Sequence, residues 1–84
     1  MGSFRSVEEV CAAARQAIEK AVPGARVEVK PASPGHFEIS VTAKAFEGRS
    51  RVQQQQLVYG AIADFMRGDE APIHAVDQLR TVVG

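Results

Sequence analysis

Two histidines, one cysteine and ten acidic side chains are the residues with which this chain could do chemistry. Nucleophilic catalysis would require Cys11 or a serine to meet His36 or His74, and the two histidines lie far apart in the sequence. The sequence contains no phosphate-binding glycine loop, dinucleotide fingerprint, paired-carboxylate arrangement or Cys-x-x-Cys zinc pair. We therefore expect a protein that is not an enzyme.

The two histidines leave two interpretations open. His36 ends a Pro/Gly-rich loop and His74 stands between Ile73 and Ala75, and a lone histidine in such a setting is more often a surface or packing residue than a ligand. The alternative is that the fold brings the loop end and the start of the last strand together. Two imidazoles placed in this way would leave a metal half-coordinated, with the remaining ligands supplied by a partner.

The composition is that of one small intracellular domain. The 84 residues are 45% hydrophobic and 24% charged, so we expect a single domain over residues 1–84, with residues 1–5 flexible. Ten basic residues balance ten acidic ones, which excludes a polycation that coats nucleic acid or lipid. Cys11 cannot form an intramolecular disulfide, and no apolar run approaches the ~20 residues of a membrane span. We therefore expect a cytoplasmic protein that does not enter a membrane.

The first element that could position these residues is a helix. Ser6 is a candidate N-cap, and Glu9, three residues later, can reach back to complete a capping box. Pro23 and Gly24 end the helix. An apolar stripe at spacings of three and four predicts the core-facing side, with the cysteine as a buried structural thiol: it comprises Val7, Val10, Cys11, Ala14, Ile18 and Ala21.

Two alternating runs and a second helical stretch follow. Residues 25–30 and 37–44 alternate apolar with polar side chains, and the loop between them predicts an antiparallel hairpin. Residues 51–67 are mostly helix formers, and Gly60 predicts a kink or break between two short helices, the second ending near Gly68. Residues 73–83, rich in Ile and Val, are the expected last strand. The order α-β-β-α-α-β predicts an α+β fold: a three-stranded mixed sheet with helices on one face.

Four consecutive glutamines, Gln53 to Gln56, cover a full helical turn, so at least one amide must face the core side. One interpretation is a solvated helix face with amide hydrogen bonds. The other is a polar contact strip flanked by Arg49 and Arg51, suited to a protein partner or to a phosphate backbone.

Four segments follow one another at spacings typical of a known family. They are an aromatic strand start at Phe37, a Phe46-x-Gly48 turn, the SRV-x-x-QQ-x-VYG segment from Ser50 to Gly60, and IHAV from Ile73 to Val76. With the capped first helix and the hairpin, the pattern covers about the whole chain. It resembles the BolA-like proteins, and within them the short bacterial branch typified by IbaG. The resemblance implies an α-β-β-α-α-β fold of the class II K-homology type.

The resemblance also implies a function. BolA-like proteins are partners of monothiol glutaredoxins and share a 2Fe–2S cluster with them, in iron–sulfur cluster maturation or trafficking and in iron or stress signalling. Glutaredoxin and glutathione supply thiolates. The BolA-like partner supplies a histidine near its C-terminus, which His74 matches. A second ligand comes from the loop between the first two strands, where His36 is the only His or Cys. The free protein is expected to be a monomer or a weak dimer.

The family's transcriptional members imply an alternative, a DNA-binding regulator. Lys44, Arg49 and Arg51 would then contact phosphates. The zero net charge and the absence of a Gly-x-x-Gly clamp rank this function second.

The chain departs from the family pattern after Val76, where Asp77-Gln78-Leu79-Arg80 replaces apolar residues on one face. Either a bulge shifts the register so that Leu79 turns inward, or the end of the strand is frayed.

Overall fold

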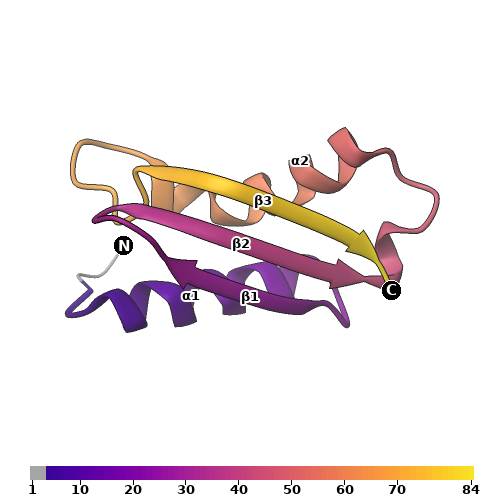
Figure 1. The fold of residues 1–84 in the computed structure, drawn as a ribbon, viewed down its shortest axis with the longest axis horizontal. Coiled ribbons are helices and arrows are strands. Elements are labelled where there is room, and N and C mark those ends of the chain that lie inside the picture. Colours follow the sequence, from indigo (N-terminus) through magenta and orange to yellow (C-terminus); the bar gives the residue numbers. More distant parts are fainter. Residues whose placement is uncertain (1–3) are drawn as a thin grey trace.

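The computed structural model describes residues 4–84, and residues 1–3 lie outside the described part, so the predicted flexibility of residues 1–5 falls largely there. The chain forms a three-stranded sheet with helices packed behind it (Figure 1). In chain order the elements are α1 (Val7–Ala21), β1 (Arg26–Pro31), β2 (His36–Ala43), the short 3-10 helix η1 (Lys44–Phe46), α2 (Arg51–Ile62), the 3-10 helix η2 (Ala63–Met66) and β3 (Ala75–Val83). The predicted fold class and element order are confirmed.

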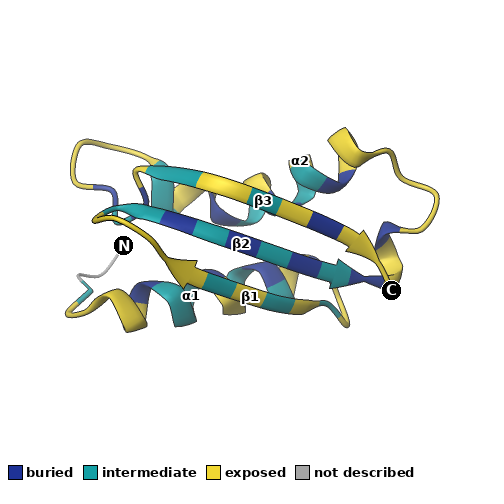
Figure 2. Cartoon of the chain, viewed as in Figure 1, coloured by how far each residue is buried: buried dark blue, intermediate teal, exposed yellow. Residues whose placement is uncertain are grey.

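The sheet is mixed, with β2 in the centre. β1 pairs with β2 antiparallel, as a hairpin requires, whereas β3 pairs with β2 in parallel because the chain crosses over through α2 before it returns. Along β2 every second residue is buried, and the intervening residues are partly exposed (Figure 2). One face of the sheet is therefore covered by α1 and α2, and the other face meets solvent.

α1 begins where the cap residue predicts. The Ser6 hydroxyl accepts a hydrogen bond from the Glu9 amide at 3.2 Å. The capping box also predicts that the Glu9 carboxylate accepts from the Ser6 amide. This part of the prediction is wrong, because the carboxylate accepts from the Arg5 amide, one residue earlier, at 2.9 Å. Of the predicted stripe, the middle turns are buried and Cys11 is half-buried, while both ends, Val7 and Ala21, are exposed because only the middle turns press onto the sheet.

α2 is one uninterrupted helix from Arg51 to Ile62, so the break predicted at Gly60 is wrong. Gly60 is exposed, and its cost of about 1 kcal/mol in a helix is tolerated there. The helix changes to the 3-10 turn η2 only after Ile62. At its start, Ser50 and Gln53 form a complete capping box.

The glutamine run places one amide inside, as predicted. Gln54 is buried, and its Nε2 donates to the carbonyl oxygens of Arg49 at 3.0 Å and of Phe46 at 3.4 Å. These carbonyls lie at the end of η1 and in the turn before α2, and the Phe46 carbonyl also accepts from the Arg49 amide at 3.0 Å. Gln54 therefore ties this turn to the helix by satisfying buried polar groups.

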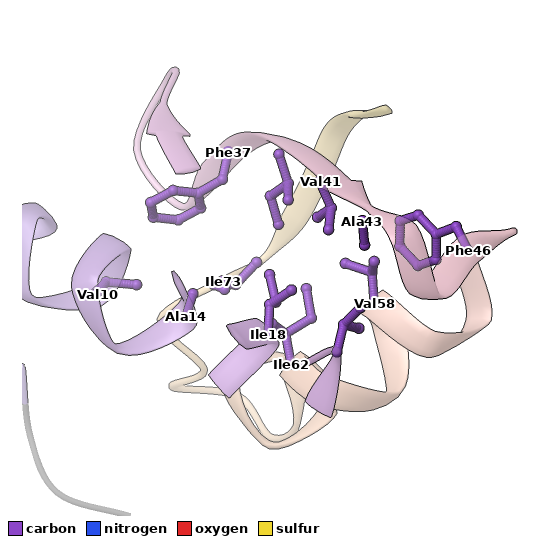
Figure 3. Close-up of a cluster of buried hydrophobic side chains, with 12 residues drawn as sticks. Val10, Ala14, Ile18, Phe37, Val41, Ala43, Phe46, Val58, Ile62 and Ile73 are labelled. Atoms are coloured by element: carbon purple, nitrogen blue, oxygen red, sulfur yellow. The ribbon is translucent and has the colours of Figure 1, made fainter. Parts of the chain in front are cut away.

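The core lies between the covered face of the sheet and the two helices. Figure 3 shows side chains from both helices and from β2 meeting in one cluster. Phe46 of η1 closes one end of it, and Ile73, just before β3, is fully buried within it. The cluster comprises Val10, Ala14, Ile18, Val22, Phe37, Ile39, Val41, Ala43, Phe46, Val58, Ile62 and Ile73.

β3 starts at Ala75, two residues later than predicted, because Ile73 pairs its amide with the Phe65 carbonyl oxygen at 3.0 Å instead of joining the ladder. Phe37 faces Val76, but the next residue of β2, Glu38, faces Gln78. Asp77 is therefore the extra residue of a β-bulge. Beyond the bulge Leu79 packs against the core, and pairing continues to Val83. Of the two interpretations of this segment, the bulge is correct.

Candidate metal-ligand site

The parallel pairing of β2 and β3 brings the two histidines to the same end of the sheet. This end, with His36, His74, Gly35 and Asp77, is called the histidine edge below. His36 is the first residue of β2, and its register partner Ala75 is the first residue of β3. His74 immediately precedes Ala75. Because parallel strands start at the same end of a sheet, residues that are far apart in the sequence become neighbours there.

The loop between β1 and β2 holds His74 against its own backbone. The carbonyl oxygen of Gly35 accepts from the amide of His74 at 2.7 Å and from the amide of Ala75 at 3.2 Å. Gly35 has φ +79°, a conformation that favours glycine, and a Cβ atom built on it would lie 2.7 Å from Nδ1 of His74. The imidazole of His74 therefore lies directly over Gly35, with its side chain exposed to solvent.

His36 is oriented by a carboxylate. Its Nδ1 lies 2.8 Å from Oδ1 of Asp77, the bulge residue, and the two side chains are 39% and 42% exposed. When the ionised carboxylate accepts this hydrogen bond, Nδ1 carries the proton and Nε2 keeps its lone pair. A histidine whose second nitrogen is held by a carboxylate is the usual arrangement of a protein metal ligand.

The possible donors described at this edge are the two imidazoles and the Asp77 carboxylate that is bonded to His36. Within residues 4–84 no group of three or more His, Cys, Asp or Glu side chains is placed to hold a metal ion. Cys11 belongs to α1 and packs against the core, and burial, followed by the charge of Glu8, raises the pKa of its thiol. The site therefore offers two exposed imidazoles and no thiolate of its own, which fits a metal centre completed by another molecule.

An open groove of about 1030 Å³ lies near this end of the sheet, and neither histidine lines it. Gly35 and Phe37 line it on the sheet side, and the segment before α1 and residues 67–72 line it on the other side. The histidine edge itself is accessible because His74 is exposed and the His36 side chain is 39% exposed.

The predicted basic residues gather at the other end of the sheet. Lys44 opens η1, directly after β2, while Arg49 and Arg51 flank the cap residue of α2, and all three are exposed. β2 has 8 residues, which separates Lys44 from His36 by about 26 Å. None of the three forms an ion pair within the described part of the chain. The three basic residues are close in the sequence, and the structure keeps them apart from the histidines.

Sequence reasoning did not identify two residues of the histidine edge, Gly35 and Asp77. Each had a signal. Gly35 ends a Pro-Gly pair beside a candidate ligand, and Asp77 stands where the alternation of the last strand fails.

Over residues 4–84, no helix is both long enough and apolar enough to span a bilayer.

Comparison with known proteins gives matches across most of the chain. The family model described as BolA-like protein matches residues 12–82. Human BolA-like protein 1 is 40% identical over 48 residues, which are 57% of this chain and only 33% of that protein. The solution structure of mouse BolA1 is 28% identical, with a TM-score of 0.68 over 99% of this chain and 73% of the mouse chain. The BolA domain of SufE1 from Arabidopsis thaliana shares the fold, with a TM-score of 0.73 at 22% identity over 99% of this chain and 94% of that domain.

Proposed function

The chain belongs to the BolA-like protein family, and from this premise we propose that it is a non-enzymatic partner of a monothiol glutaredoxin. In this proposal the two proteins share a 2Fe–2S cluster, which His74 and His36 bind from this side. The complex acts in iron–sulfur cluster maturation or trafficking, or in iron and stress signalling, in the cytoplasm. The single cysteine of the sequence favours such a reducing compartment.

The observation that carries the proposal is the pair of imidazoles at one exposed edge of the sheet. A 2Fe–2S cluster needs four protein or small-molecule ligands, and two of them can be histidines. His36 and His74 stand at the same end of the sheet because β2 and β3 are parallel, and the hydrogen bond to Asp77 involves Nδ1 of His36 and not Nε2. Two ligands on an open surface suit a cluster that is shared between two proteins better than a cluster that one protein binds alone.

The remaining ligands would be thiolates of the glutaredoxin and of glutathione. Cys11 is not available for this role, because burial raises the pKa of its thiol and α1 packs it against the core. When bound, a cluster with imidazole in place of thiolate has a higher reduction potential than one with thiolates only. The contribution of this chain is to present two imidazoles in a fixed orientation.

The test is reconstitution with a monothiol glutaredoxin, iron, sulfide and glutathione. We expect a 1:1 heterodimer with the visible absorption and circular dichroism of a 2Fe–2S centre. His74→Ala should lose the cluster more than about 10-fold faster than the parent protein. Glu47→Ala, an exposed change beyond the other end of β2, is the control and should leave the spectrum unchanged. An unchanged spectrum and lifetime in His74→Ala would contradict the proposal.

A second candidate function is binding of DNA, favoured by one observation. Lys44 and Arg49 on the connection between β2 and α2, and Arg51 at the start of α2, are exposed, and their charges are not neutralised by ion pairs within residues 4–84. Three phosphate contacts predict a log–log salt slope of about −2.7 for duplex DNA.

Fluorescence anisotropy of a labelled duplex at several salt concentrations measures this slope. Replacing the three basic residues together by alanine should abolish the binding. A matched control removes three exposed basic side chains of α1 and β1, namely Lys20, Arg26 and Lys30. Equal loss in both triple variants would show that only unspecific charge is involved, and no salt-sensitive binding at low ionic strength would exclude this function.

A further inference from the structure

Asp77 has a specific role at the histidine edge that rests on the function proposed above. We infer that Asp77 is a positioning residue for His36: its carboxylate accepts a hydrogen bond from the Nδ1–H group and thereby presents Nε2 as the nitrogen that binds metal. The carboxylate itself does not touch the metal.

The β-bulge is what brings Asp77 to this place. In a regular ladder Val76 and Gln78 would both face the core, and Asp77 would stand opposite Glu38. The extra residue instead leaves Asp77 outside the pairing, next to the start of β2, with its Oδ1 2.8 Å from Nδ1 of His36. Bulges commonly re-aim a single side chain beside a functional site. Here the same bulge also lets Leu79 pack on the core, so the fold itself maintains the position of the carboxylate.

The contact decides between the two nitrogens of His36. A neutral imidazole carries its proton on one nitrogen and binds metal through the other, and the hydrogen bond of the protonated nitrogen selects which is which. Because a carboxylate can only accept, Asp77 assigns the proton to Nδ1. It also restricts rotation of a side chain that is 39% exposed and would otherwise sample several orientations.

The two histidines are therefore held by different means. His74 is held sterically and through its backbone by Gly35, at 2.7 Å for the amide hydrogen bond. His36 is held through its side chain by Asp77. Removal of Asp77 should consequently affect His36 alone. Loss of an outer partner of a histidine ligand typically costs 10–100-fold in metal affinity.

The first experiment needs no metal and no partner. The tautomer of each histidine is read from ¹⁵N-resolved NMR spectra of the free protein at about pH 8.5, where an ordinary imidazole is neutral. We expect His36 to carry its proton on Nδ1 in the parent protein and in Glu47→Ala, which removes a carboxylate beyond the far end of β2. In Asp77→Ala the proton should move toward Nε2, and the amide spectrum should stay dispersed because Asp77 is a partly exposed residue. An Nε2 proton in the parent protein would overturn the inference.

The second experiment uses the reconstituted complex with the glutaredoxin. Asp77→Ala should lose the cluster about 10-fold faster than the parent complex. The double variant His36→Ala/Asp77→Ala should behave as His36→Ala alone, because Asp77 acts only through His36. A further loss in the double variant, or no effect of Asp77→Ala on the cluster, would overturn the positioning role. If the parent protein forms no shared cluster at all, the proposed function fails, while the tautomer experiment still decides whether Asp77 orients His36.

Discussion

Replacing Gly35 by alanine adds one methyl group to the histidine edge, next to the imidazole of His74. Gly35 has φ +79°, and an L side chain in this left-handed region costs about 1–2 kcal/mol. For a domain of this size, 1 kcal/mol lowers the melting temperature by about 4–8 °C. Gly35→Ala should therefore lower Tm by roughly 4–16 °C through backbone strain alone.

The added methyl group has a second effect that strain does not describe. It would lie 2.7 Å from Nδ1, 2.8 Å from Cγ and 3.2 Å from Cε1 of His74. These separations are shorter than ordinary van der Waals contact, so the ring must move. Because the side chain of His74 is exposed, it can rotate into solvent at little energetic cost. The clash should therefore appear as a displaced ligand and not as additional loss of stability.

Gly48→Ala separates the two effects. Gly48 has φ +80°, nearly the same as Gly35, and nothing lies within 4 Å of a Cβ atom built on it. Both variants should lose a similar amount of stability, measured by thermal unfolding followed by circular dichroism. Only Gly35→Ala should shift the Hδ2 and Hε1 resonances of His74 and shorten the lifetime of the shared cluster. If the His74 resonances were the same in the two variants, the contact between Gly35 and the imidazole would be refuted.

Three further predictions concern stability and reactivity. Gln54→Ala removes the side-chain donor of the Arg49 carbonyl, while the Phe46 carbonyl keeps its bond from the Arg49 amide, and should destabilise the fold by about 1–3 kcal/mol in urea unfolding. Gln56→Ala, on the exposed side, should stay within about 0.5 kcal/mol. Thr81→Val removes a buried hydroxyl that has no hydrogen-bond partner within residues 4–84 and should raise stability by about 1 kcal/mol, so a lower Tm would contradict the burial described for it. Burial and then the charge of Glu8 raise the pKa of Cys11, so iodoacetamide should alkylate it more slowly than a free cysteine at pH 8, and faster as the pH rises. Glu8→Gln should speed the reaction, and an unchanged rate would exclude the effect of the Glu8 charge.

Much of the fold follows from local patterns in the sequence. The cap at Ser6, the alternation of the two hairpin strands and the inward amide of the glutamine run all appear where the sequence predicts them. These features depend on residues within one turn or one strand, and their physical causes act over the same short range. The order of the elements then leaves few topologies, which is why the fold class could be predicted.

The errors occur where distant segments compete with local preference. Gly60 would weaken an isolated helix, but packing of Val58 and Ile62 on the core keeps α2 continuous across it. Ile73 reads as a strand residue, yet its amide bonds to the carbonyl of Phe65, and β3 begins only at Ala75. In both cases a tertiary contact outweighs a propensity of about 1 kcal/mol or less.

The identity of the chemical groups was determined by the sequence alone: two histidines, one thiol on an apolar stripe, and no motif of an enzyme. Their arrangement was decided only by the tertiary structure. The pairing of His36 with Asp77 and the contact of Gly35 with His74 both depend on the register of β3 against β2, including the bulge at Asp77. Register is set by the sum of packing on the core across two strands, and a shift of one residue turns every side chain to the other face. A local sequence pattern does not report the packing of two whole strands. The orientation of the two imidazoles therefore follows from the fold and not from their positions in the chain.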